Sequence, residues 1–138
     1  LLNDGPLEEW PGLFCEDCFY AVIPRDNHEA GLPLAIMRCE SRGMLEDRVY
    51  SVRETMVYEP RYIRHHITNI QILGEQDGLI ESTANYTIIE TLMDELPKIL
   101  NSGKYLDKIK MDDGQYRFAE KYCVFDSILV PNSIIYPA

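Results

Sequence analysis

Apolar residues follow a helical spacing in the first half of the chain and a strand-like spacing in the second half. The clearest helical signal runs from Met44 to Tyr58. Its apolar positions recur at steps of four, three and four, at Leu45, Val49, Val52 and Met56. Pro60 predicts the end of this helix, because the residue before a proline is pushed out of the α region. A shorter stripe, Leu7, Trp10, Leu13 and Phe14, predicts a brief amphipathic helix near the start.

Later segments alternate or carry short apolar runs, as strands do. The predicted strands are 18–23, 34–37, 64–73, 80–92, 99–111 and 116–125, with polar connections at 24–33, 74–78 and 94–98. In 64–73 we expect Ile70 and Ile72 on one face and Ile67 and Leu73 on the other. Asp112-Asp113-Gly114 predicts a tight hairpin turn, since glycine supplies the positive φ that such turns need.

This order of elements predicts an α+β fold, in which a curved, mostly antiparallel sheet wraps over N-terminal helices. The length of 138 residues suits one domain spanning the whole chain. The apolar runs are too short to span a bilayer, and the N-terminus has no basic start followed by an apolar stretch. We therefore expect a cytoplasmic protein.

The charge argues against two classes of partner. Thirteen basic and twenty-three acidic side chains give a net charge of −10, spread along the chain. Nucleic-acid readers need a basic face, and anionic membrane surfaces attract basic segments. Neither a nucleic acid nor a membrane is therefore expected as a partner.

The four cysteines, at positions 15, 18, 39 and 123, include a CxxC pair. A structural zinc site would need two more ligands from Cys39, Cys123 or His28, and these form no second close pair. Redox chemistry is disfavoured because the intervening Glu16 and Asp17 would raise a thiol pKa. Buried, inert thiols are the preferred interpretation.

Several motifs follow one another along nearly the whole chain: Glu16-Asp17-Cys18, Gly31-Leu32-Pro33, Arg64-His65 with Thr68-Asn69-Ile70, Gly103-Lys104-Tyr105 with Asp107, Asp112-Asp113-Gly114, AEKYCVFDS and VPNS. In this order they resemble one family, the small or β subunits of aromatic-ring-hydroxylating dioxygenases. The N-terminal half is most similar to partners of oxygenases acting on aromatic acids such as salicylate or terephthalate. The chain departs from the family at Cys15, and Leu1 to Asn3 would be only the last turn of a usually longer first helix.

The resemblance implies a nuclear-transport-factor-2-like cone and a non-catalytic subunit, assembled as three large and three small chains. It implies that the Rieske iron–sulfur cluster and the mononuclear iron belong to the large subunit, within an assembly that uses NAD(P)H and O₂. The residues agree: no cysteine has a histidine at CxH or CxxH spacing. His65 and His66 are neighbours on a predicted strand, so they point to opposite faces and cannot chelate one ion together.

The expected role is assembly, through contacts with the large subunit and between copies in a homotrimer. The candidate interface residues are Arg64, Tyr105, Asp107, Leu129, Pro131, Asn132, Ile134, Ile135 and Tyr136. In the C-terminal tail, Ile134, Ile135 and Tyr136 are costly to leave in water.

Two alternatives remain open at this stage. The same cone also houses stand-alone isomerases and dehydratases. Pocket candidates for that function are His65, His66, Tyr86, Glu120 and Tyr122, with Asp107 as a further carboxylate. Residues of these types more commonly make a buried hydrogen bond or a cross-strand contact than act in catalysis. The other alternative is a ligand-binding or assembly module unrelated to oxygenases.

Overall fold

The computed structural model describes residues 6–31, 35–58 and 61–126, with backbone alone at 55–58. Its elements are the 3₁₀ helix η1 (Leu7–Leu13), β1 (Phe14–Pro24), α1 (Arg25–Glu29), β2 (Met37–Cys39), α2 (Arg42–Tyr58), β3 (Arg61–Gln76), β4 (Leu79–Leu92), β5 (Lys98–Asp112) and β6 (Gln115–Phe125). The predicted α+β class and the curved sheet are confirmed. Leu1 to Asn3, the strand residue Leu34, the Met56 side chain and all the tail candidates from Leu129 to Tyr136 lie outside the described part.

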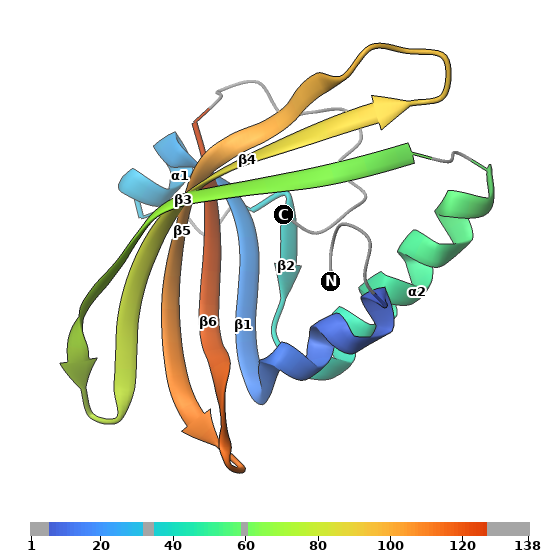
Figure 1. Ribbon diagram of the computed structural model, residues 1–138. Coiled ribbons are helices and arrows are strands. Elements are labelled where there is room, and N and C mark those ends of the chain that lie inside the picture. The colour runs from blue at the N-terminus through green and yellow to red at the C-terminus, as the bar shows by residue number, and fades with distance from the viewer. Residues whose placement is uncertain (1–5, 32–34, 59–60, 127–138) are drawn as a thin grey trace.

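The strands form one six-stranded sheet in the order β2-β1-β6-β5-β4-β3. Every neighbouring pair is antiparallel except β1 and β6, which run parallel. The sheet curves around η1 and α2, and the first half of β3 passes over toward the C-terminal end of α2 (Figure 1). We call the face toward η1 and α2 concave and the opposite face, which carries α1, convex.

The core lies between the concave face and the two helices. Leu45, Val49 and Val52 of α2 are buried, which confirms the helical stripe. Trp10 of η1 meets the rings of Phe14 and Tyr20 edge to face, with centroids 5.2 and 5.4 Å away. Such aromatic packing adds stability beyond the buried area.

Polar contacts fix the helices to each other and to β1. The Glu8 carboxylate of η1 accepts two hydrogen bonds from the Arg53 guanidinium of α2, at 2.6 and 3.0 Å. These hydrogen bonds lower the pKa of Glu8 to about 2. The Arg42 guanidinium donates to the Phe14 carbonyl oxygen at 2.7 and 3.1 Å, which joins the start of α2 to the start of β1.

Three sequence predictions are corrected. The predicted N-terminal helix stops one residue early: Phe14 begins β1, and Leu13 is exposed. Residues 25–29, predicted as a connection, form α1, which is too short to show a helical period. Ile67 shares the concave face with Ile70 and Ile72, because an extra residue interrupts the alternation of β3 between Thr68 and Gln71.

Candidate functional site

Large aromatic side chains fill the concave side of the sheet. Tyr20, Tyr86, Phe14 and Phe125 are almost fully buried, and Tyr105 is 3% exposed. The Tyr86 and Tyr105 rings stack with centroids 4.4 Å apart. Burial raises the pKa of both phenols far above the usual value, so neither is a ready source of phenolate. This part of the cone is packed as a core.

Two buried ion pairs lie within that core. The Lys121 ammonium lies 3.1 Å from an Asp107 carboxylate oxygen and 3.8 Å from the Tyr105 ring centroid. Burial raises the pKa of Asp107, and the ion pair with Lys121 partly opposes that shift. Near the start of β3, Arg61 donates to Glu90 at 2.7 Å, and both side chains are under 5% exposed. Each charge has a partner, as buried charges require.

The cysteines are free thiols, and all four are buried. Burial raises the pKa of Cys18 to about 11 and that of Cys123 to about 12. It raises the pKa of Cys15 and of Cys39 as well. Thiolates are therefore scarce near neutral pH, which agrees with the preferred interpretation of inert thiols. Within the described ranges, no group of three or more His, Cys, Asp or Glu side chains is placed to hold a metal ion.

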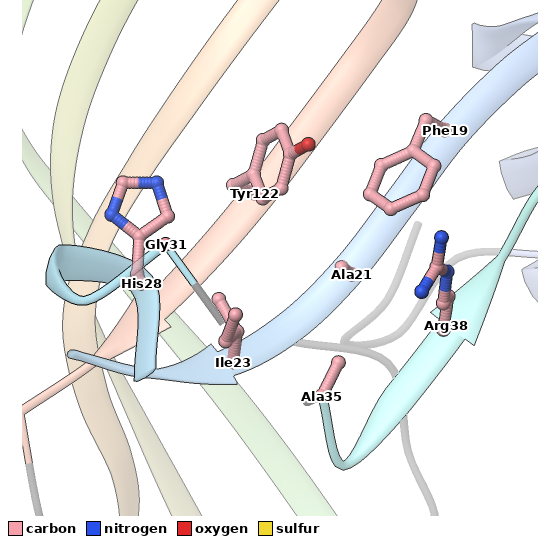
Figure 2. A pocket seen from close by; sticks show the side chains of 8 residues that line it. All are labelled: Phe19, Ala21, Ile23, His28, Gly31, Ala35, Arg38 and Tyr122. Carbon is pink, nitrogen blue, oxygen red and sulfur yellow. The ribbon is translucent and has the colours of Figure 1, made fainter. Parts of the chain in front are cut away.

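A hollow of about 340 Å³ opens on the convex face, between α1, β1, β2 and β6. Figure 2 shows His28 and Tyr122 at one end, Phe19 and Arg38 at the other, and Ala21 and Ile23 on the floor. The Arg38 guanidinium lies 5.2 Å from the Phe19 ring centroid and pairs with Glu40 at 3.0 Å. Among the described residues that line this hollow, none is a carboxylate that could act with His28 as a general base.

A neighbouring hollow of about 370 Å³ shares His28 and Tyr122 and extends across β4 and β5. Its rim carries the pair between Lys108 and Glu120, at 3.2 Å. Glu120 is thus occupied by a salt bridge. Burial raises the pKa of Tyr122, and the nearby Glu120 raises it further. Glu81 also lines this hollow, so the described residues around His28 and Tyr122 include carboxylates.

The structure separates the pocket candidates of the enzyme alternative. His65 is opposite Ile88, and Tyr86 is opposite Ile67, so both lie on the concave face. His66 is opposite Thr87 on the convex face, with Glu120 and Tyr122 beyond it. Residues on opposite faces of a sheet cannot act on one substrate together. The geometry therefore does not bring all five residues of this set together at one site.

The interface candidates fall into two groups. Arg64 is exposed on the convex face, opposite Ile89, as a contact residue should be. Tyr105 is 3% exposed and the Asp107 side chain 9%, so little of either side chain is open to a partner. Sequence alternation could not show which face of β5 the helices would cover.

Two sets of exposed apolar side chains lie outside the interface candidates of the sequence analysis. The concave patch consists of Ile67, Ile70, Ile72, Met111 and Tyr116, which are 49% to 69% exposed. The convex patch consists of Tyr62, Met93, Leu96 and Ile99, which are 67% to 85% exposed. Contiguous apolar surface of this kind marks contact sites. The signal for the concave patch that the sequence offered was the group of isoleucines on both sides of Asn69 in the predicted strand 64–73.

Register shows which apolar side chains share the concave face with the patch residues. Ile72 lies opposite Ser82, and Ile80 of β4 lies opposite Ile109 of β5. Ile109 in turn lies opposite Phe118, and Met111 lies opposite Tyr116. The concave patch therefore extends from the edge strand β3 to β6 along the end of the sheet that carries the β3–β4 and β5–β6 hairpins (Figure 1).

Comparisons with known proteins agree with one another. A family profile described as "Ring hydroxylating beta subunit" matches residues 1–132. The anthranilate 1,2-dioxygenase small subunit of Burkholderia cepacia is 32% identical over 99% of this chain and 84% of its own length. A β subunit of the terephthalate 1,2-dioxygenase terminal oxygenase component from Comamonas is 31% identical over 99% of this chain and 88% of its own.

A solved structure extends the agreement to three dimensions. It is a β subunit assigned to an aromatic-ring-hydroxylating dioxygenase of Novosphingobium aromaticivorans, 36% identical, with a TM-score of 0.86 over 99% of this chain and 87% of that one. Among the described helices, none combines the length and apolar character that crossing a membrane requires.

Proposed function

Because the chain belongs to the family of ring-hydroxylating β subunits, we propose that it is the structural small subunit of a multicomponent aromatic-ring-hydroxylating dioxygenase in the catabolism of aromatic compounds. The observation that carries the proposal is the family match over nearly the whole chain. The filled cone and the two exposed apolar patches support it from the geometry. Its curated relatives are named for anthranilate and terephthalate, so an aromatic acid is the proposed substrate class of the assembly.

The proposal assigns the chemistry to the large subunit. A Rieske cluster, a mononuclear iron, NAD(P)H and O₂ would serve the assembly, and this chain would bind none of them. The separation of His65 and His66 onto opposite faces supports this assignment, because a mononuclear iron site uses two histidines and a carboxylate that converge.

The proposed partners are the large subunit and further copies of this chain, as a homotrimer within an α3β3 assembly. Obligate interfaces commonly bury about 2,000 Å² or more and are more apolar than ordinary surface. The concave and convex patches offer such surface. A reducing cytoplasm is the proposed location, and the four free thiols are compatible with it.

The test is reconstitution with the large subunit of the proposed assembly. Purified alone, the protein should be colourless, contain no iron and hydroxylate no aromatic acid. Mixed with the large subunit and an electron donor, it should copurify in a defined complex and support hydroxylation. Stoichiometric iron in the chain alone, or a large subunit that neither binds it nor needs it for assembly, would contradict the proposal.

A further inference from the structure

The hollow on the convex face, between α1, β1, β2 and β6, has an apolar floor. Ala21 and Ile23 alternate along β1 with the core residues Tyr20 and Val22, so their side chains point to the convex face. Ala35, which precedes β2, adds a further aliphatic side chain to the lining. Sites for small molecules have this character, since they are mostly apolar and carry a few placed polar groups.

Three rings stand around this floor. The Phe19 and Tyr122 rings lie with centroids 5.2 Å apart and planes tilted by 37°. The His28 ring of α1 meets the Tyr122 ring edge to face, with centroids 5.7 Å apart. All three side chains are only partly buried, so each keeps ring surface within reach of a ligand. A flat aromatic ligand would find stacked and edge-to-face partners here, which are the arrangements that aromatic rings prefer.

A guanidinium group lies at the Phe19 end of the hollow (Figure 2). Arg38 pairs through Nε with a Glu40 carboxylate oxygen at 3.0 Å, and its side chain is 45% exposed. In the described part of the chain, its other recorded contact is with the Phe19 ring, so the two terminal NH₂ groups remain to donate to a ligand. Two parallel N–H donors of a guanidinium match the two oxygens of a carboxylate.

Charge and volume define the ligand further. The carboxylates of Glu81 and Glu120 lie in the neighbouring hollow, beyond His28 and Tyr122, so an anionic group is favoured at the Arg38 end alone. The volume of about 340 Å³ is near the lower end of the range for ligand sites, roughly 300–1,000 Å³. A cavity of about 150 Å³ suffices for benzene. The hollow therefore has room for one ring with a carboxylate and a small substituent.

We propose that this hollow is a binding site for a single-ring aromatic carboxylate. The carboxylate accepts hydrogen bonds from Arg38, and the ring packs against Phe19 and Tyr122. Binding loosens the pair between Arg38 and Glu40, at small cost because exposed ion pairs contribute little to stability. The site rests on the proposed function only for the choice of probe, since the curated relatives are named for anthranilate and terephthalate. It lies in this chain, apart from the chemistry assigned to the large subunit.

The test titrates the purified full chain with benzoate and measures affinity by saturation-transfer difference NMR. The wild type should bind saturably, with a dissociation constant of about 1 mM or tighter. Arg38→Gln should weaken binding about tenfold, because a hydrogen bond to a charged group is lost. Glu40→Gln should tighten binding about threefold, because it removes the carboxylate that competes for Arg38. A residue that only supports the fold would not produce effects of opposite sign.

The matched control is Arg25→Gln. The Arg25 side chain is 51% exposed, pairs with Asp126 at 3.6 Å and is not among the residues that line the hollow. The variant removes the same charge as Arg38→Gln and should leave the affinity for benzoate unchanged. Two further probes separate the ring from the charge. Benzamide, which has no charge, should bind about tenfold more weakly than benzoate, and cyclohexanecarboxylate, which has no aromatic ring, about threefold more weakly.

The inference is overturned if benzoate does not bind saturably, or if Arg38→Gln and Arg25→Gln change its affinity equally. It is also overturned if cyclohexanecarboxylate binds as tightly as benzoate. If Arg38→Gln fails to fold by circular dichroism, Glu40→Gln decides, and an affinity no tighter than that of the wild type overturns the inference. The proposed function fails by a different result, when the wild-type chain does not bind the large subunit, whatever its affinity for benzoate.

Discussion

At the residue scale, two adjacent ion pairs between β5 and β6 point to opposite faces of the sheet. Asp107 lies opposite Lys121, and Lys108 lies opposite Glu120. The first pair is about 10% exposed and the second about 40%. Breaking a buried pair leaves an uncompensated charge, whereas exposed pairs contribute little. The same two strands therefore provide a test and its control.

We expect Asp107→Asn and Lys121→Met each to lower the free energy of unfolding by about 3–5 kcal/mol. The double variant should lose less than the sum of the two, because it leaves no unpaired charge. The control, Glu120→Gln, should cost under about 1 kcal/mol. Urea unfolding of the wild type and the four variants measures these differences. Additive losses would show that the buried pair is not coupled.

The pH dependence of stability has a definite sign for Asp107. Burial raises its pKa in the folded protein above the unfolded value of about 3.9. The folded state therefore keeps this proton up to a higher pH than the unfolded state does. The contribution that this proton makes to the free energy of unfolding is present at low pH and is lost as pH rises through the folded-state pKa. In Lys121→Met the opposing effect of Lys121 is gone, so this loss should move to higher pH. Unfolding free energies measured from about pH 4 to about pH 8 test the shift.

Position 103 requires glycine, because the backbones of β5 and β6 approach each other closely there. A Cβ at this position would meet the Val124 carbonyl oxygen and would lie 2.7 Å from Phe125 Cα. Gly103→Ala should therefore destabilise the fold by about 3 kcal/mol, near the upper end for overpacking, because backbone cannot move aside as a side chain can. Gly12→Ala is the matched control, since a Cβ at Gly12 would have no neighbour within 4 Å. Equal melting temperatures for the two variants would refute this account.

At the element scale, the bulge in β3 decides which residues share a face. Asn69 has a φ of 53°, which asparagine tolerates and β-branched residues do not. Asn69→Gly should keep the stability of the wild type to within about 0.5 kcal/mol, and Asn69→Val should lose about 1–2 kcal/mol. Urea midpoints compare the two. A fully tolerated valine would mean that the positive φ is not required.

The sequence predicted most elements, and it failed where a local irregularity or a tertiary contact decides. Helical spacing placed α2 within two residues, and Asp113-Gly114 placed the β5–β6 turn, because both signals are local. Alternation put Ile67 on the wrong face, since one inserted residue at Asn69 reverses the parity. Tyr105 and Asp107 were taken for contact residues because alternation alone cannot show which face the helices cover. The separation of His65 from His66 was predictable, since neighbours on a strand always point apart.

At the scale of the whole molecule, stability and assembly are linked. A net charge of −10 repels copies of the chain from one another, so the proposed homotrimer requires burial of apolar surface at its contacts. Any partner that binds only the folded state raises the melting temperature by mass action, and the effect grows with concentration. The melting temperature of the wild type should therefore rise as protein concentration rises, and rise again when the large subunit is added.

Ile72→Glu provides the comparison, because it changes an exposed side chain and leaves the packed core intact. If Ile72 lies in a contact of the proposed homotrimer, the melting temperature of this variant should match that of the wild type at low concentration and should not depend on concentration. Differential scanning calorimetry over a hundredfold range of concentration makes the measurement. A wild-type melting temperature that is equally independent of concentration would mean that the exposed isoleucines of β3 are not covered by another copy. The large subunit would then be the one proposed partner left to remove these isoleucine side chains from water.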